Sequence, residues 1–146
     1  MKIALPVNNA MTLYRDNPHT APKFAIYEIK NSQDCVIFTL ASIVQNPWNI
    51  MREKNFDNNQ VQCKCDFIKE NTISHKCEHY ALLDAINGCK YLLANQYCKN
   101  TKNTMRNGGI IISKIPPIIN QIDMAIKNFL IGASLADTIK HIHHGS

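Results

Sequence analysis

The chain has 146 residues, of which 45% are hydrophobic and 18% are charged, and its formal net charge is +5. This length suits one domain with a core of normal size. The charge is too small and too scattered to indicate a nucleic-acid-binding protein. No basic segment is followed by a long apolar run, so neither a signal peptide nor a membrane-spanning helix is predicted. The expected location is the cytoplasm, where cysteines remain thiols or metal ligands.

The first half of the chain predicts three strands in an antiparallel meander, because apolar stretches there alternate with turn-forming residues. The strands are expected at residues 2–7, 24–29 and 35–44. A polar loop over residues 10–21 joins the first two strands and contains His19. Residues 49–73 are polar and rich in Asn and Lys, which indicates an insertion. A loop this long inside a compact domain is usually functional or partly disordered.

The second half predicts helices that alternate with strands. Helices are expected at residues 74–87, 99–107 and 117–132, and strands at residues 89–95 and 110–115. Such alternation favours parallel strands flanked by helices. The order β-β-β-α-β-α-β-α therefore predicts an α/β fold with a mixed five-stranded sheet. We assign residues 1–132 to one domain, with Gly132 ending its last helix, and residues 133–146 to a frayed tail.

Five potential metal ligands lie close together in the sequence, in or just after the insertion. They are Cys63, Cys65, His75, Cys77 and His79. Thiolate and imidazole suit zinc, iron–sulfur clusters and other soft or borderline metals, whereas calcium and magnesium prefer oxygen. The spacings C-x-C and H-x-C-x-H differ from the C-x2-C pairs of zinc fingers, so the pattern predicts a metal without specifying zinc.

The H-x-C-x-H segment has three possible interpretations. In a regular helix the 100° step per residue places His75 and His79 within about 40° of each other and turns Cys77 away. Leu82 and Ile86 would then share the face of His79. Three ligands on one ion would instead require an extended or loosely turned backbone at residues 74–78. A metal-free helix capped by Ser74 is the third possibility.

Several short motifs occur in the order found in one protein family. They are Met1-Lys-Ile-Ala-Leu-Pro-Val, Pro18-His19-Thr-Ala21-Pro22-Lys-Phe24, Asn46-Pro47, Leu82-Leu83 through Gly88-Cys89, and Gly109-Ile-Ile-Ile. Together they resemble the dinitrogenase iron–molybdenum cofactor biosynthesis family, the NifX/NafY type of cluster-binding domain. The resemblance implies a ribonuclease H-like fold and a role in metallocluster assembly for nitrogen fixation. The chain departs from the family after His19, where Phe-Gly is missing, and at Cys98, where glycine is common.

The resemblance makes His19 a candidate cofactor-binding residue, and Cys98 is a second candidate. Cys98 follows the fourth predicted strand, and ligands gather at the carboxyl ends of parallel strands in open α/β sheets. We therefore expect a non-catalytic carrier of an iron–sulfur or iron–molybdenum cluster, or of its precursor. Its partners would be cluster donor and acceptor proteins, with no nucleic acid and no membrane, and the carrier would be a monomer or a homodimer.

Two other functions compete with the carrier. One is a zinc-stabilised interaction module of the same fold, in which Cys63, Cys65, Cys77 and one histidine of the pair His75 and His79 close a tetrahedral site. The other is a nuclease, which needs clustered carboxylates for two-metal chemistry. The first strand contains no Asp or Glu, and Glu28 in the second has no evident partner, so the nuclease is excluded. The basic residues Lys99, Lys102 and Arg106 are interpreted as a solvated helix face.

Overall fold

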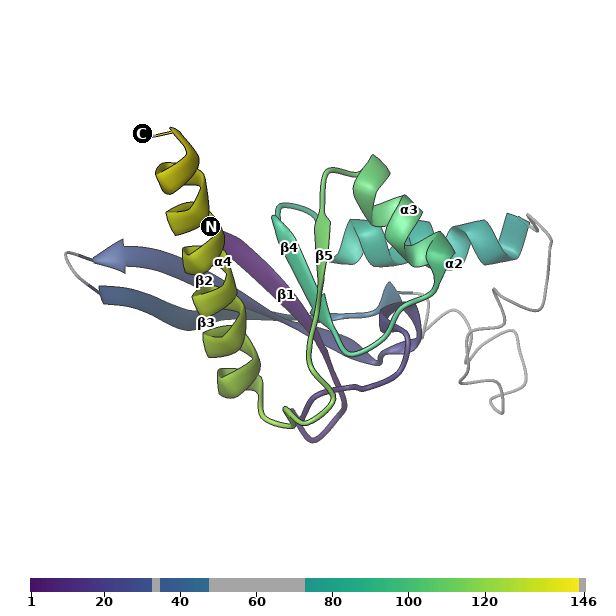
Figure 1. Cartoon of the computed structure of the whole chain (residues 1–146). Coiled ribbons are helices and arrows are strands. Elements are labelled where there is room, and N and C mark those ends of the chain that lie inside the picture. The colour runs from purple at the N-terminus through teal and green to yellow at the C-terminus, as the bar shows by residue number, and fades with distance from the viewer. Residues whose placement is uncertain (33–34, 48–72, 145–146) are drawn as a thin grey trace.

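The structure is a computed structural model that describes residues 1–32, 35–47 and 73–144 (Figure 1). Side chains are described at residues 1–31, 35–47 and 79–134. The predicted ligands Cys63 and Cys65 lie outside the described residues.

Five strands of the described residues form one mixed sheet. They are β1 (Lys2–Val7), β2 (Lys23–Ser32), β3 (Cys35–Gln45), β4 (Tyr91–Ala94) and β5 (Ile111–Lys114). The order across the sheet is β3-β2-β1-β4-β5. β1, β2 and β3 pair antiparallel, whereas β4 is parallel to β1 and β5 is parallel to β4. The predicted α/β class, the meander and the mixed five-stranded sheet are therefore confirmed.

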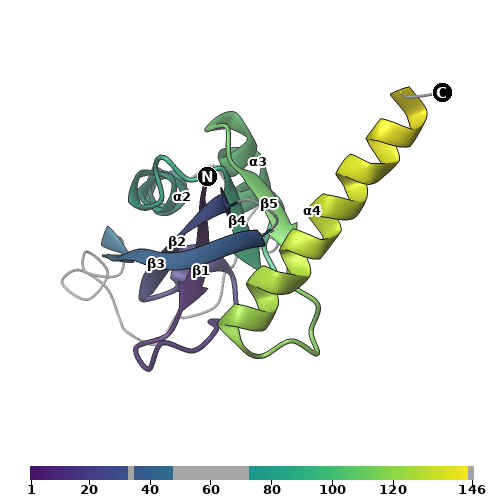
Figure 2. The ribbon, with the colours of Figure 1, turned by 90° about the vertical axis from the view of Figure 1, so that its left-hand side faces the viewer.

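In the described part of the chain, three α-helices and a short 3-10 helix cover the two faces of the sheet. They are η1 (Pro18–Thr20), α2 (Ile73–Ala85), α3 (Lys99–Asn107) and α4 (Ile122–His144). Figure 2 shows α2 on one side of the sheet and α4 on the other. Leu82 of α2 and Met105 of α3 are buried in one apolar cluster, and Ile126 of α4 is buried in a second. Because side chains alternate along a strand, β1 supplies Ala4 to the first cluster and Ile3 to the second.

The last helix differs from its prediction at both ends. It begins at Ile122 rather than at 117, after a turn in which the Ile119 N–H donates to the Pro116 carbonyl at 3.1 Å. Proline disfavours the helical conformation in the residue before it, so Pro117 opposes a helix through Pro116, and the turn at residues 116–119 separates both prolines from α4. α4 then continues through Gly132, because one glycine costs a helix only about 1 kcal/mol. The predicted tail from residue 133 is therefore wrong as far as His144. Among the described helices, none is both long and apolar enough to cross a membrane.

Candidate metal site

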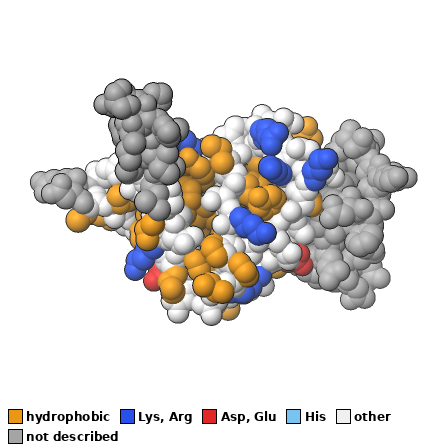
Figure 3. Space-filling model, viewed as in Figure 1, with side chains coloured by type: hydrophobic (Ala, Val, Ile, Leu, Met, Phe, Trp, Pro, Cys, Tyr) orange, Lys and Arg blue, Asp and Glu red, His pale blue; other side chains and the backbone are white. Residues whose placement is uncertain are grey.

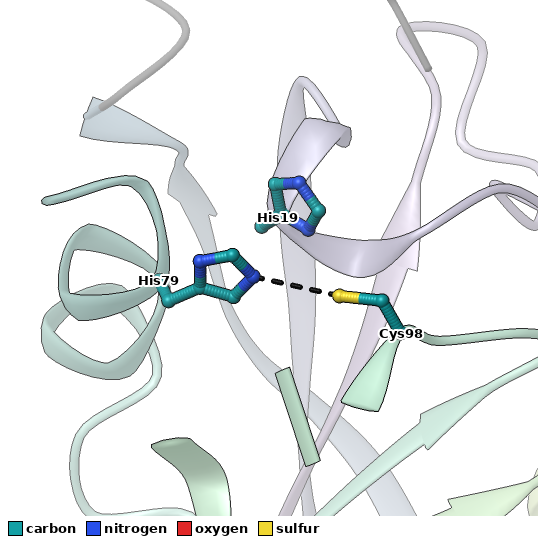
Figure 4. A group of neighbouring side chains, drawn as sticks. All are labelled: His19, His79 and Cys98. Carbon is teal, nitrogen blue, oxygen red and sulfur yellow. Dashed lines mark hydrogen bonds between the residues drawn. The ribbon is translucent and has the colours of Figure 1, made fainter. Parts of the chain in front are cut away.

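Three side chains meet where η1, α2 and the start of α3 come together (Figure 4). His19 belongs to η1, His79 to α2, and Cys98 is the residue that precedes α3. Their exposed fractions are 1%, 2% and 6%. One potential ligand atom from each residue lies within 4.8 Å of the others. The two imidazole rings are tilted by 33°, with their centroids 4.5 Å apart.

Local sequence explains how each of these side chains reaches the group. Pro18 opens the η1 turn that contains His19, and its ring already favours helical backbone angles. His79 shares a helix face with Leu82 and Ile86, which are fully buried, so this face of α2 points into the molecule. Cys98 follows β4 at the carboxyl end of that parallel strand.

The surroundings of Cys98 favour negative charge on its sulfur. Cys98 is the N-cap of α3, and its Sγ accepts a hydrogen bond from the Thr101 backbone N–H at 3.5 Å. The Thr101 hydroxyl lies 3.1 Å from the same sulfur, and His79 Nε2 lies 3.5 Å from it. The positive end of the α3 dipole acts in the same direction. Thiolate is the form in which cysteine binds metals, so the position suits a ligand.

Thr101 links two of the three potential ligands. Its side chain is fully buried, and its Oγ1 lies 3.4 Å from His19 Nδ1 as well as 3.1 Å from Cys98 Sγ. Groups that hydrogen-bond to ligands fix the ligands' orientation and tune their basicity. Thr101 was not predicted from the sequence. Its position could have indicated a contact, because the side chain of an N-cap residue accepts a hydrogen bond from the backbone N–H three residues later.

The structure brings together residues that the sequence placed in two different sets. His19 and Cys98 were predicted as cofactor-binding residues and His79 as a metal ligand, and all three join one group. α2 is continuous through residues 75–79, so the extended backbone that three convergent ligands on this segment would require is not adopted. The side chains of His75 and Cys77 lie outside the described side chains.

Comparisons with known proteins show similarity at the level of the fold. No family model matches the chain, and no curated protein matches it. Among solved structures, the chain is similar to PH0822, known from a crystal structure, with a TM-score of 0.53 and 13% sequence identity. The similarity covers 90% of this chain and 92% of that one. The chain is thus an α/β protein with a buried His19–His79–Cys98 group that could hold a metal ion.

Proposed function

We propose that this protein binds a single transition-metal ion through His19, His79 and Cys98 and passes it to other proteins. The observation that carries the proposal is the convergence of three buried donors from η1, α2 and the start of α3. Three protein ligands leave a coordination position open, and a ligand from an acceptor protein can enter there. The proposal is for a binding protein and includes no catalytic step.

The spacing of the donor atoms supports one ion. Metal–nitrogen bonds of about 2.0–2.1 Å and metal–sulfur bonds of about 2.3 Å place neighbouring donors of a tetrahedral site roughly 3.3–3.8 Å apart. Cys98 Sγ and His79 Nε2 are 3.5 Å apart, and all three donors lie within 4.8 Å. Small side-chain movements would therefore complete the coordination. A cluster, in contrast, spreads its ligands over several metal atoms and needs donors farther apart.

The chemistry of the donors limits the choice of metal. Two imidazoles and a thiolate suit zinc, copper and iron, whereas carboxylate and carbonyl oxygens suit magnesium and calcium. The potential metal-binding group among the described residues contains no carboxylate, so its donors match the first set of metals rather than the second. A ligand thiolate must stay reduced, so the proposal locates the protein in a reducing compartment such as the cytoplasm.

A second candidate is the carrier of an iron–sulfur or iron–molybdenum cluster, with cluster donor and acceptor proteins as partners. One observation favours it specifically. His19, the position that the resemblance to the NifX/NafY family suggests as cofactor-binding, belongs to the buried group. We also propose that the fold is ribonuclease H-like, which is supported by the antiparallel β1–β2–β3 unit continued by parallel β4 and β5. In this candidate, Cys63 and Cys65 would supply further ligands.

The test is the metal content of protein purified anaerobically after iron-replete expression. Elemental analysis for Fe, Mo, Cu and Zn should find about one metal ion per wild-type chain. Cys98→Ser should lose most of it. Cys89→Ser is the matched control, because Cys89 is equally buried but lies outside the donor group and should keep its metal. Metal-free wild type, or equal metal in both variants, would contradict the proposal.

A second variant separates the single ion from the cluster. The double change Cys63→Ser and Cys65→Ser should leave a single ion in place, because His19, His79 and Cys98 remain. A cluster carrier should lose iron and visible absorption on the same change. If the double variant fails to fold while the chelated wild type also unfolds, the metal is structural, as in the zinc-stabilised module.

A further inference from the structure

β3 is an edge strand of unusual character. It has eleven residues, Cys35–Gln45, and among the described residues it is the last strand on one side of the sheet. No Asp, Glu, Lys or Arg occurs between residues 35 and 51. An edge strand presents unpaired backbone N–H and C=O groups, and proteins usually protect such an edge with charge, proline or short length. β3 has none of these three protections, and its one irregularity is the bulge opposite Ile26 and Tyr27.

One face of β3 has a row of apolar side chains, which we call the apolar row. It consists of Val36, Phe38, Leu40 and Ile43, which pair across to Asn31, Ile29, Tyr27 and Ala25 of β2. A bulge between the pairs of Ile26 and Tyr27 keeps Ile43 on this face.

The helix α4 covers only part of the apolar row. Phe38 packs edge-on against Tyr27, with ring centroids 6.2 Å apart, and joins the cluster under α4. Val36, Leu40 and Ile43 remain 49%, 47% and 44% exposed. Figure 3 shows hydrophobic side chains on the β2–β3 hairpin beside α4.

The opposite edge of the sheet is built differently. β5 has four residues and ends in the exposed Lys114. Lys102 and Arg106 of α3 line a hollow of about 250 Å³ beside residues 109–112, and Figure 3 shows basic side chains gathered over α3. Short length and positive charge protect this edge against pairing with another strand. The contrast between the two edges is the reason to assign β3 an interaction role.

We propose that β3 pairs antiparallel with β3 of a second copy of this chain, joining two sheets into one of ten strands. A two-fold axis perpendicular to the sheet keeps α4 of both copies on the same side, so the two apolar rows lie next to each other. In this arrangement β3 of one copy lies beside β3 of the other, so any charged side chain near the centre of the strand would face a like charge. The absence of charge from residues 35–51 makes the strand compatible with itself.

The size of the interface predicts a reversible dimer. Eleven residues at about 3.3 Å each give a strand of about 36 Å. Pairing along that length buries on the order of 1,000 Å² in total, the lower limit for specific interfaces. The dimer should therefore dissociate on dilution. The metal-binding group lies on the other face of the sheet, and its loading should not depend on pairing.

Analytical ultracentrifugation over a range of protein concentrations tests the proposal on the full chain. Wild type should show a monomer–dimer equilibrium. Leu40→Lys should raise the dimer dissociation constant by at least about tenfold, because it brings two like charges into an apolar contact. Ile111→Lys is the matched control. Ile111 is 53% exposed, on the opposite edge strand of the same sheet, and its substitution should leave the equilibrium unchanged. Val36→Lys replaces Leu40→Lys if the latter fails to fold.

Three results would overturn the proposal. One is a wild-type chain that stays monomeric up to about 1 mM. Another is an equal effect of the two lysine substitutions on the equilibrium. The third is a melting temperature of the dilute monomer that falls much further in Leu40→Lys than in Ile111→Lys, because it would mean that the apolar row is covered within one chain.

Discussion

The side-chain amide of Asn46 donates a hydrogen bond of 2.9 Å to the backbone carbonyl of His19. The same nitrogen donates to the Ala21 carbonyl at 2.8 Å, so both of its hydrogens bond the segment around η1. Asn46 directly follows β3 and is 1% exposed. The end of the edge strand therefore holds the turn that positions one of the three potential metal ligands.

Asn46→Ala should destabilise the protein and weaken metal binding together. It leaves two buried carbonyl groups without their donor, and each such loss costs about 1–3 kcal/mol. We expect the free energy of unfolding to fall by roughly 2–6 kcal/mol in urea titrations. Competition with a chelator should report weaker metal binding, because His19 is less firmly held.

Asn95→Ala is the control for this change. Asn95 follows β4, and its amide makes one longer hydrogen bond, of 3.4 Å, to the Ile115 carbonyl. Its substitution should lower the free energy of unfolding by less than about 1.5 kcal/mol. A loss in Asn95→Ala that equals the loss in Asn46→Ala would contradict the role given to Asn46.

Thr101→Val should reduce metal affinity with little effect on the fold. Valine keeps the shape of threonine but removes the hydroxyl that contacts Cys98 Sγ and His19 Nδ1. Loss of a group that orients metal ligands typically weakens binding by about 10–100-fold. Thr101→Ser retains the hydroxyl and should retain most of the affinity. Chelator competition compares the two variants, and equal weakening would assign Thr101 a packing role alone.

Sequence patterns predicted β1 and α3 to the residue. β1 is buried on both faces and reads as a continuous apolar strand, and α3 lies between Cys98 and the Gly108-Gly109 pair. Both ends of α4 were predicted wrongly, because Pro117 was interpreted as the first helical residue and Gly132 as the helix stop. The turn at residues 116–119 delays the start of α4, and packing of Ala125 and Ile126 against the sheet outweighs the helix-stop signal of Gly132.

The group of His19, His79 and Cys98 could be predicted only in part. The helical step of 100° correctly placed Leu82 and Ile86 on the face of His79. Nothing in the local sequence places His79 beside His19 and Cys98, because that depends on how α2 packs against η1 and α3. The sequence therefore divided one group of residues into two candidate sites.

The stability of the protein should fall at alkaline pH through Cys89. Burial raises the pKa of the Cys89 thiol above its ordinary value of 9.0, and the charge of Lys2 opposes this by a smaller amount. The folded chain then holds a proton that the unfolded chain releases, so stability is full below pH 9.0 and declines as the pH rises above it.

Urea titrations of chelated protein at about pH 8 and about pH 10 measure this loss. Cys89→Ser carries no titrating thiol at this position, so it should lose less stability between the two pH values than wild type. Tyr27 has a pKa raised above 10.0 by burial and by Asp123, and it contributes at the alkaline end in both proteins. An equal pH dependence in the two proteins would contradict the assignment to Cys89.

Gly132→Ala tests whether α4 passes through Gly132. A Cβ at this position meets no atom within 4 Å, and alanine is a better helix former than glycine, so the variant should gain about 0.5–1 kcal/mol in stability. Gly88→Ala is the opposite case. Gly88 follows α2 with a φ of 93°, where a side chain costs about 1–2 kcal/mol. Thermal melts should therefore move in opposite directions for the two variants. If α4 ended at Gly132 in a left-handed cap, both melting temperatures would fall.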